Sequence, residues 1–363
     1  MAYGSVNADL MTTSDGVSSS GLYGFKNRLI NSAMVIDQRN AGALINPMAD
    51  ATYYLDRWRA SATQTSKLSI GQNAGSVTPP AGFTNYMGFT SLSAYSITSG
   101  DIFGIAQNIE GFNVADLGWG TANAQAVTLS FWVRSSLTGT FGGSFRNSAS
   151  SRSYPISYTI SSANTWEQKS ITVAGDTSGT WLTTNGIGIL LFLSLGSGST
   201  YSGTAGSWSG SVYTSATGAT SVVGTNGATF YITGVQLEKG STATSFDYRP
   251  YGQELSLCQR YFYRLNTTTG GDNTIATGAN SASHNLFVIK MPTELRAKPT
   301  ITKTGTSFTV YSGGSNTANA TFASSTAGTQ QSRIIFNLTG SSGNSCWIDL
   351  DNANTYFDFS SEL

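Results

Sequence analysis

Short segments in which apolar and polar residues alternate recur along most of the chain. In VTLSFWVRS (127–135), Val127, Leu129, Phe131 and Val133 share one face, the period of two that marks a half-buried β-strand. Helical periodicity over about 11 residues or more is nearly absent. Further strands are predicted at Lys26–Arg39, Tyr53–Arg59, Ser153–Ile160, Trp166–Val173, Ile187–Leu195 and Ala228–Glu238. The pattern therefore predicts an all-β protein.

The predicted strands fall into a large central domain at 26–249. Turn sequences such as Gly175-Asp176 and Asn185-Gly186 separate strands at spacings of roughly 15–25 residues, which is typical of a jelly-roll or related β-sandwich. Trp58 and Trp132 lie within predicted strands, so both are expected in the core.

A short helix is predicted at 250–264 (PYGQELSLCQRYFYR), where it would link the sandwich to a smaller domain. Arg249 and Tyr251, beside Pro250, would form the corner at this junction. The smaller domain, 265–363, is expected to be a second β-sandwich. Its predicted strands are Leu286–Met291, Thr300–Lys303, Ser307–Tyr311, Arg333–Leu338, Ser345–Asp349 and Tyr356–Leu363.

Residues 1–25 are small, polar and rich in Gly and Ser, so they cannot form a core of their own. One interpretation is an assembly arm that becomes ordered against another chain, and the other is a disordered tail. The residues of this segment that would anchor such an arm are Tyr3, Leu10, Met11, Leu22 and Tyr23.

Composition narrows the functional classes. Charged residues make up 10% of the chain, and the 19 basic and 19 acidic residues cancel, so there is no basic surface for nucleic acid. The surface must be covered mainly by Ser, Thr, Asn and Gly. Such a weakly charged surface tolerates close packing of identical copies. No signal peptide is recognised at the N-terminus, and no apolar run is long enough to span a bilayer. Cys258 and Cys346 match no zinc or redox spacing, so buried thiols are expected.

Three stretches carry a family resemblance: 26–59 (NRLINSAMVIDQRNAG, then YYLDRW), 127–195, and 228–264 with its FYITGVQLEKG, FDYRPYGQEL and CQRYF motifs. They resemble tail-fibre and virion structural proteins of tailed bacteriophages, as does the FSSEL ending. The resemblance implies a central jelly-roll like the galactose-binding-like carbohydrate-binding modules. It also implies a homotrimeric appendage subunit located in the virion, with other virion proteins and host-surface polysaccharide as partners.

The sequence offers little for catalysis, so no enzyme is predicted. His284 is the single histidine, which excludes histidine metal clusters and most acid–base triads. Asp101, Glu110 and Asp116 lie close enough in sequence to share a loop, but such a trio more often satisfies turn backbone groups than hydrolyses glycosides. No cofactor is expected beyond a structural calcium ion. In modules of the resembled type, acidic residues near strand ends can hold calcium, and Glu238 and Asp247 are the weak candidates here.

Aromatic residues in loops are the strongest candidates for glycan contact, because sugar rings pack their C–H faces on Trp and Tyr. The nearly continuous Gly/Ser/Thr stretch 196–227 contains Tyr201, Trp208 and Tyr213, and Trp119 lies in LGWG (117–120). The alternative is that these aromatics pin the long excursion onto the sandwich or a neighbouring subunit.

Three functions are compatible with these features. The first is an appendage subunit, in a tail fibre or baseplate fibre, that attaches the phage to host glycans. The second is a purely structural capsid-decoration, head-fibre or tail-adaptor subunit. The third, a glycan-degrading depolymerase, ranks last because paired carboxylates are missing.

Overall fold

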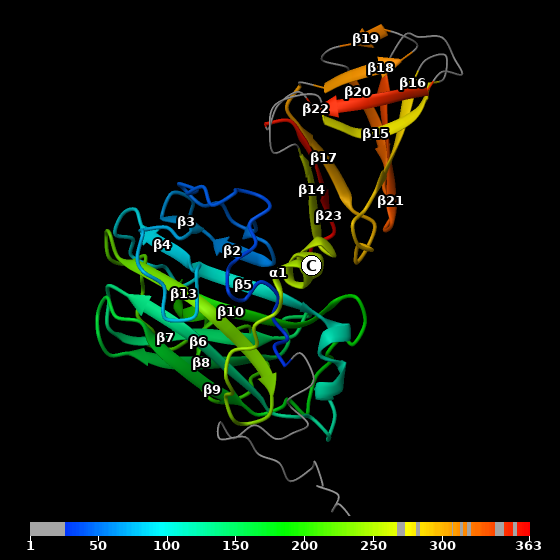
Figure 1. Ribbon diagram of the computed structural model, residues 1–363. Helices are drawn as coiled ribbons and strands as arrows, with labels where there is room; N and C mark the ends of the chain where they lie inside the picture. Colours follow the sequence, from blue (N-terminus) through cyan, green and yellow to red (C-terminus); the bar gives the residue numbers. More distant parts are fainter. Residues whose placement is uncertain are drawn as a thin grey trace, which may run out of the picture. The chain divides into compact units, whose positions relative to one another are not determined.

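A computed structural model describes residues 26–266, 273–280, 284–306, 308–312, 315–317, 321–337, 345–350 and 354–363. The chain divides into an N-terminal unit that ends at Pro250 and a C-terminal unit that begins at Tyr251. Strands form nearly all of the regular structure in both, which confirms the predicted all-β class (Figure 1). In the described part of the chain, no helix has the length and apolar character needed to cross a membrane.

Two antiparallel sheets form the N-terminal unit. The six-stranded sheet has the order β1 (Tyr53–Leu55), β2 (Trp58–Ala62), β5 (Ile102–Glu110), β10 (Ile187–Ser197), β7 (Gly139–Arg146) and β8 (Ser153–Ile160). The five-stranded sheet has the order β3 (Leu68–Gln72), β4 (Met87–Ser91), β13 (Thr229–Lys239), β6 (Val127–Ser135) and β9 (Glu167–Val173). The predicted strands at 127–135, 153–160, 166–173, 187–195 and 228–238 are thus confirmed within a residue or two.

Apolar residues from both sheets meet in one core. Phe131 of the five-stranded sheet lies 4.9 Å from Tyr158 of the six-stranded sheet, and Phe141 lies 6.0 Å from Phe230, measured between ring centroids. Trp58 is fully buried in this core, as predicted. The unit is therefore a β-sandwich closed by aromatic contacts between its layers.

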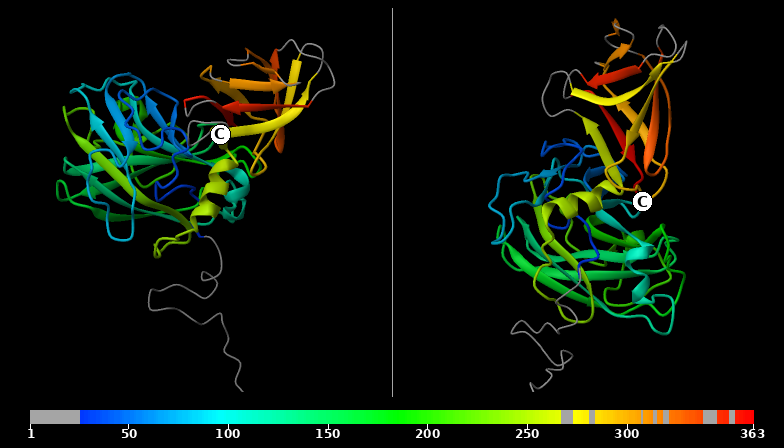
Figure 2. Two further views of the ribbon diagram at one scale, coloured as in Figure 1. Left: turned by 45° about the horizontal axis from the view of Figure 1, so that its top comes forward. Right: turned by 45° about the vertical axis from the view of Figure 1, so that its right-hand side comes forward.

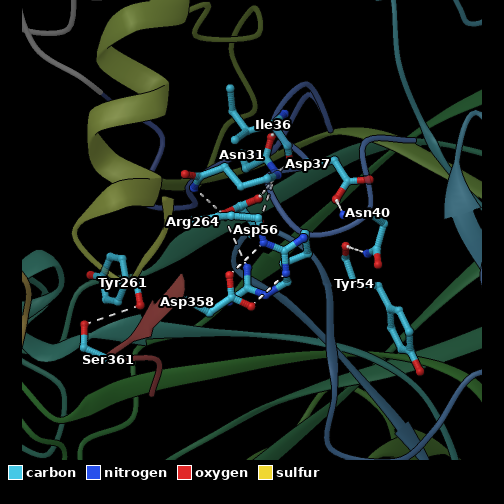
Figure 3. A network of polar contacts seen from close by, with 12 residues as sticks. Asn31, Ile36, Asp37, Asn40, Tyr54, Asp56, Tyr261, Arg264, Asp358 and Ser361 are labelled. Atoms are coloured by element: carbon cyan, nitrogen blue, oxygen red, sulfur yellow. Dashed lines mark hydrogen bonds and ion pairs between the residues drawn. The ribbon is translucent and has the colours of Figure 1, made fainter. Parts of the chain in front are cut away.

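The predicted strand at Lys26–Arg39 is wrong. Asn31 and Met34 have φ angles of 54° and 59°, and these left-handed residues reverse the chain where a strand would need extended backbone. The Asn31 amide donates to the carbonyls of Ile36 and Asp56, and its oxygen accepts from the Ile36 N–H (Figure 3). The segment is a buried irregular turn held by Asn31 together with Asn27, which accepts from the Leu29 N–H, and Gln107, which bonds both backbone groups of Ile30.

The predicted strand at Tyr53–Arg59 is in fact a hairpin. Leu55 pairs with Trp58, so Asp56 and Arg57 form a two-residue turn between β1 and β2. Arg57 has a φ of 71°, and neither turn residue is glycine. The alternating pattern continues through the turn, which is why the sequence predicts one strand.

The C-terminal unit begins with the predicted short helix, α1 (Tyr251–Gln259), the yellow-green coil in Figure 2. A three-stranded sheet follows, β14 (Phe262–Asn266), β23 (Tyr356–Ser360) and β17 (Thr300–Thr304). A seven-stranded sheet has the order β19 (Ser315–Thr317), β18 (Phe308–Ser312), β22 (Ser345–Leu350), β15 (Asn273–Asn280), β16 (His284–Lys290), β21 (Gln331–Asn337) and β20 (Thr321–Thr326). A separate core that includes Phe287, Phe308, Phe336 and Phe357 lies within this unit.

Candidate functional site

Trp208 and Trp119, two of the predicted glycan contacts, belong to a packed aromatic cluster. The Trp208 ring centroid lies 5.3 Å from that of Trp119, 5.4 Å from Trp181 and 5.0 Å from Tyr154. The Trp208 indole N–H donates to the Ala174 carbonyl at 2.8 Å, and Trp119 is only 6% exposed. This geometry favours a packing role for both tryptophans.

Tyr201 and Tyr213, the other two candidates, are half-buried within the same excursion. Tyr201 ends the short 3-10 helix Ser199–Tyr201, and the Tyr213 ring packs so closely on Gly203 that a Cβ there would lie 2.3 Å from it. The short strands β11 (Ser202–Gly203) and β12 (Ser215–Ala216) pair beside these residues. The excursion is thus a structured layer.

This layer covers part of the outer face of the six-stranded sheet. Ser209 pairs with Ser153 at the edge strand β8, and the Thr220 N–H donates to the Thr140 carbonyl at 2.6 Å. A Cβ at Gly142 of β7 would lie 2.2 Å from Ser215 Oγ, so glycine is needed for the layer to seat. The structure therefore agrees with the alternative in which aromatics hold the excursion on the sandwich.

Glu238 and Asp247, the calcium candidates, each hold backbone segments. Glu238 accepts hydrogen bonds from the Thr244 N–H at 2.8 Å and the Thr244 hydroxyl at 2.7 Å. Asp247 accepts from the N–H groups of Lys26 and Asn27 at 2.9 and 3.2 Å. Within the described ranges, no group of three or more His, Cys, Asp or Glu is arranged to hold a metal ion.

Asp101, Glu110 and Asp116 do not share a loop, contrary to the expectation from their spacing. Asp101 precedes β5 and Glu110 ends it, so the nine-residue strand separates them by about 30 Å. Asp116 forms a bidentate pair with the Arg28 guanidinium, with oxygen–nitrogen distances of 2.8 and 2.9 Å. Asp101 is therefore too far from Glu110 to form the paired carboxylates of a glycosidase.

The proposed assembly residues Tyr3, Leu10, Met11, Leu22 and Tyr23 lie outside the described residues. His284 lies on β16 and is exposed.

A group of candidate site residues that the sequence analysis missed lies on the outer face of the five-stranded sheet. Because Val127, Leu129, Phe131 and Val133 of β6 point into the core, Trp132 and its alternate neighbours point outward. Trp132 is half-buried and lies outside the core, so its predicted core position is wrong. We call this surface the Trp132 face; it comprises Trp132, Arg134, Trp166, Gln168 and Tyr231.

Arg134 is the cation of this face. It pairs across the sheet with Tyr231, and its guanidinium carbon lies 6.0 Å from the Tyr231 ring centroid. No hydrogen bond or ion pair to Arg134 exists among the residues that the structure describes, and its buried Nε has no partner. The guanidinium is therefore available to a ligand.

Gln168 and Trp132 form a cross-strand pair next to Arg134. Gln168 is exposed, and neither its amide nor the Trp132 indole N–H is hydrogen-bonded to any described part of the protein. Since residues two apart on a strand face the same way, Trp132 and Arg134 stand side by side. A ligand here would meet an aromatic ring, an amide, an indole donor and a guanidinium.

The segment Asn73–Thr78 forms a wall at the Tyr231 end of the face. The Trp166 indole N–H donates to the Thr78 carbonyl at 2.8 Å, and the Tyr86 hydroxyl donates to the Ala74 carbonyl at 3.0 Å. Burial raises the pKa of Tyr86, while the Val77 N–H and the nearby Arg134 charge act in the opposite direction. Glycines leave room for the wall, because a Cβ at Gly88 would lie 2.7 Å from the Ala74 oxygen.

This arrangement has the chemistry of a saccharide-binding surface. Pyranose C–H faces pack on indole rings. Sugar hydroxyls accept hydrogen bonds from guanidinium groups, and they can both donate to and accept from amides. The outward direction of Trp132 and Arg134 can be predicted from the sequence, because the alternation that places Val133 inside places both of these residues outside.

No protein-family model and no curated protein matches the sequence. Among solved structures, an arabinose-bound α-L-arabinofuranosidase is 14% identical, with a TM-score of 0.34 over 62% of this chain. The enzymatically active domain of tailspike protein 4 of bacteriophage CBA120 is 13% identical, with a TM-score of 0.31 over 51% of this chain. A family 61 carbohydrate-binding module in complex with β-1,4-galactotriose is 10% identical, with a TM-score of 0.29 over 59% of this chain.

The matches differ in how much of the other protein they cover. The chain spans 27% of the arabinofuranosidase and 20% of the tailspike chain, but 99% of the carbohydrate-binding module. At these identities and TM-scores, none of the similarities assigns a function to this chain. The Trp132 face therefore provides the structural basis for a function.

Proposed function

We propose that the protein is a glycan-binding subunit of a tailed-phage appendage and that the Trp132 face holds the saccharide. The observation that carries the glycan-binding part is the juxtaposition of Trp132, Arg134 and Gln168, whose polar groups have no partners in the described chain. A half-buried tryptophan beside a guanidinium with no partner in the described chain leaves an aromatic face and hydrogen-bond donors available to a ligand. The virion location is supported by the sequence resemblance at 26–59, 127–195 and 228–264.

Binding without catalysis is part of the proposal. Asp101 and Asp116 are engaged by hydroxyl, N–H and guanidinium donors, and Glu110 lies at the far end of β5 from Asp101. These contacts favour a structural role for the three carboxylates, which lie close together only in the sequence.

The test is affinity for host cell-surface polysaccharide, measured by isothermal titration and by retention in affinity gels. We expect Trp132→Ala and Arg134→Met each to weaken binding about tenfold or more, because a hydrogen bond to a charged group contributes about 1.5–3 kcal/mol and 1.4 kcal/mol is a factor of ten. Both side chains lie outside the core, so circular dichroism and melting temperature should change little.

Trp208→Ala is the matched control, since it also removes one indole but from the packed cluster. Retained affinity in Trp208→Ala with loss in Trp132→Ala supports the proposal. The reverse result would place the saccharide site in the Gly/Ser excursion. If the wild type does not bind even at high concentration, the protein does not recognise this glycan.

Trimerisation belongs to the same proposal and has support from the C-terminal unit. Trp347 and Val288 are 41% and 46% exposed on one face of the seven-stranded sheet, and the Trp347 ring stacks on Tyr311 with centroids 5.0 Å apart. Exposed apolar residues on a sheet favour burial against another copy. Sedimentation of the full chain should give a trimer that Trp347→Ser weakens, and a stable wild-type monomer would contradict it.

A capsid-decoration or tail-adaptor subunit is the second candidate, favoured by the 10% content of charged residues and the apolar face just described. In that case the Trp132 face would be covered by neighbouring subunits. Hydroxyl-radical footprinting of intact particles distinguishes the two, because an adhesive subunit leaves Trp132 open to oxidation and an adaptor protects it.

A further inference from the structure

Three aromatic rings form a compact cluster in the N-terminal unit. The Phe83 ring centroid lies 5.0 Å from that of Phe246 and 5.5 Å from that of Tyr248, and the Phe246 and Tyr248 centroids are 4.8 Å apart. We call this cluster the Tyr248 triad. Its rings come from two segments, the loop that precedes β4 and the chain that follows β13. Phe83 and Phe246 are half-buried, but Tyr248 is 57% exposed.

The triad lies on the same outer face of the five-stranded sheet as the Trp132 face. Gln236 of β13 has a core residue on either side of it in the sequence, so its side chain points away from the core. The Gln236 side-chain oxygen accepts a hydrogen bond from the Asp247 N–H at 2.8 Å. Since Asp247 lies between Phe246 and Tyr248 in the sequence, this bond holds the segment that carries both rings against the outer face.

The strand register places the triad next to Trp132. Trp132 pairs with Thr233 of β13 on one side and with Gln168 of β9 on the other. Phe83 packs directly over Gly234, the residue after Thr233, because a Cβ at Gly234 would lie 2.5 Å from the Phe83 ring. Neighbouring strands are about 4.8 Å apart, so the row from Gln168 to Gly234 crosses roughly 10 Å of the sheet and ends at the triad. A single sugar ring is too small to contact both ends of this row.

Tyr248 is held in place although more than half of it is exposed. Its ring contacts Phe83 and Phe246, and Gly82 leaves room for its hydroxyl, since a Cβ at Gly82 would lie 2.7 Å from the Tyr248 oxygen. Among the residues that the structure describes, none is hydrogen-bonded to this hydroxyl. An aromatic ring that is ordered before binding loses little side-chain freedom when a ligand packs on it. Tyr248 therefore offers a second aromatic surface on the outer face.

We propose that the Trp132 face and the Tyr248 triad form one extended site for an oligosaccharide chain, in which Trp132 and Tyr248 contact different sugar residues. This inference rests on the proposed function, because it extends the saccharide site at Trp132. It adds the class of ligand, a stretch of several sugar residues within a polysaccharide and not a single terminal sugar. It also gives the direction of the bound chain, which runs across the strands from β9 towards β13.

The experiment titrates the full chain with a disaccharide, a tetrasaccharide and an octasaccharide prepared by partial hydrolysis of host cell-surface polysaccharide. We expect affinity to rise with chain length, because only the longer ligands reach both aromatic surfaces. Tyr248→Ala should lower the affinity for the octasaccharide about tenfold and leave that for the disaccharide unchanged, whereas Trp132→Ala should weaken the binding of all three. Tyr248→Phe keeps the ring and should bind like the wild type. Tyr251→Ala is the matched control, since Tyr251 is 63% exposed but lies on α1, and it should change nothing.

Equal affinity of the wild type for the disaccharide and the octasaccharide would overturn the extended site and leave the proposed function intact. The same conclusion would follow if Tyr248→Ala kept the full rise in affinity with chain length. An equal loss for all ligands in Tyr248→Ala, together with a lower melting temperature, would assign Tyr248 a packing role only. Absence of binding by every ligand would overturn the proposed function and the extended site together.

Hydroxyl-radical footprinting of the wild type tests the same inference without a variant. The octasaccharide should protect both Trp132 and Tyr248 from oxidation, and the disaccharide should protect Trp132 alone. Protection of Trp132 by the octasaccharide with no protection of Tyr248 would contradict the extended site.

Discussion

At the scale of single residues, Asp101 shows how one carboxylate fixes the start of a strand. Its Oδ2 accepts from the Thr98 N–H at 2.8 Å, the Thr98 hydroxyl at 2.7 Å and the Tyr95 hydroxyl at 2.9 Å, and its Oδ1 accepts from the Thr63 hydroxyl at 2.8 Å. Burial raises the pKa of Asp101, but these hydrogen bonds lower it more, to about 2. The ionised form is therefore the one that the fold requires.

Stability should fall in acid through this group. The folded pKa of about 2 lies below the ordinary aspartate pKa of 3.8, so the stabilisation that Asp101 gives is present above about pH 4 and is lost as pH falls through 2. Urea unfolding of the wild type and Asp101→Asn, at pH 7 and at pH 2.5, should give a large difference at pH 7 and a smaller one at pH 2.5. A constant difference would mean that hydrogen bonding to the charged form is unimportant.

Asn31 holds the irregular turn near the N-terminus of the described chain. Asn31→Ala should destabilise the N-terminal unit by about 2–4 kcal/mol, because it leaves the Ile36 and Asp56 carbonyls and the Ile36 N–H without their partner. Asn164 is an exposed asparagine with a similar φ of 56°, so Asn164→Ala controls for the backbone conformation alone. Equal losses in chemical denaturation would assign the whole effect to backbone strain.

The turn at Asn31 and the exposed face around Trp132 are two features that the sequence alone does not predict. The alternation in β6 was enough to place Trp132 outward, but no local pattern tells whether an outer face is bare or covered by another segment. Likewise, most apolar residues of Lys26–Arg39 are buried as expected. The left-handed backbone at Asn31 and Met34 could not be predicted, because neither residue is glycine, the residue that usually marks such a conformation. Local pattern predicts burial better than it predicts chain direction.

At the scale of elements, the Gly/Ser excursion 196–227 forms an extra layer on the outer face of the six-stranded sheet. The layer has no core of its own. It is held by backbone pairing at Ser209, by the β11–β12 pair and by the Trp208 ring, and Val222 and Val223 at its end are buried in the core of the sandwich. The sequence predicted such a fastening as one of two interpretations. It could not choose between them, because the partners Trp181 and Tyr154 are distant in sequence.

Trp208→Ala should loosen this layer. We expect a loss of about 2–3 kcal/mol, less than for a fully buried tryptophan because Trp208 is half-buried. Hydrogen exchange should speed up in residues 202–216 and stay unchanged in β6 and β13. Uniform acceleration across the unit would show that the cluster supports the whole sandwich and not the layer alone.

At the scale of the whole molecule, the two units have separate cores. The buried clusters of the N-terminal and C-terminal units have no residue in common. Six of the seven tryptophans precede residue 250, and Trp347 alone follows it. The units should therefore unfold as two transitions that fluorescence can separate.

Calorimetry of the full chain should resolve two components, with the C-terminal unit expected to melt first because its core is smaller. Trp347→Phe should remove the fluorescence change of one transition and keep that of the other. A single cooperative transition seen by both methods would contradict independent units.

The position of β13 has a consequence for biosynthesis. This strand lies between β4 and β6 in the five-stranded sheet, yet it follows β4 by well over a hundred residues. At about 5–20 residues per second, roughly 7–30 s pass between the synthesis of β4 and that of its later neighbour β13. During that interval Met87 and Phe89 have only the earlier neighbour β3 in their sheet, so one edge of β4 stays unpaired until β13 is made.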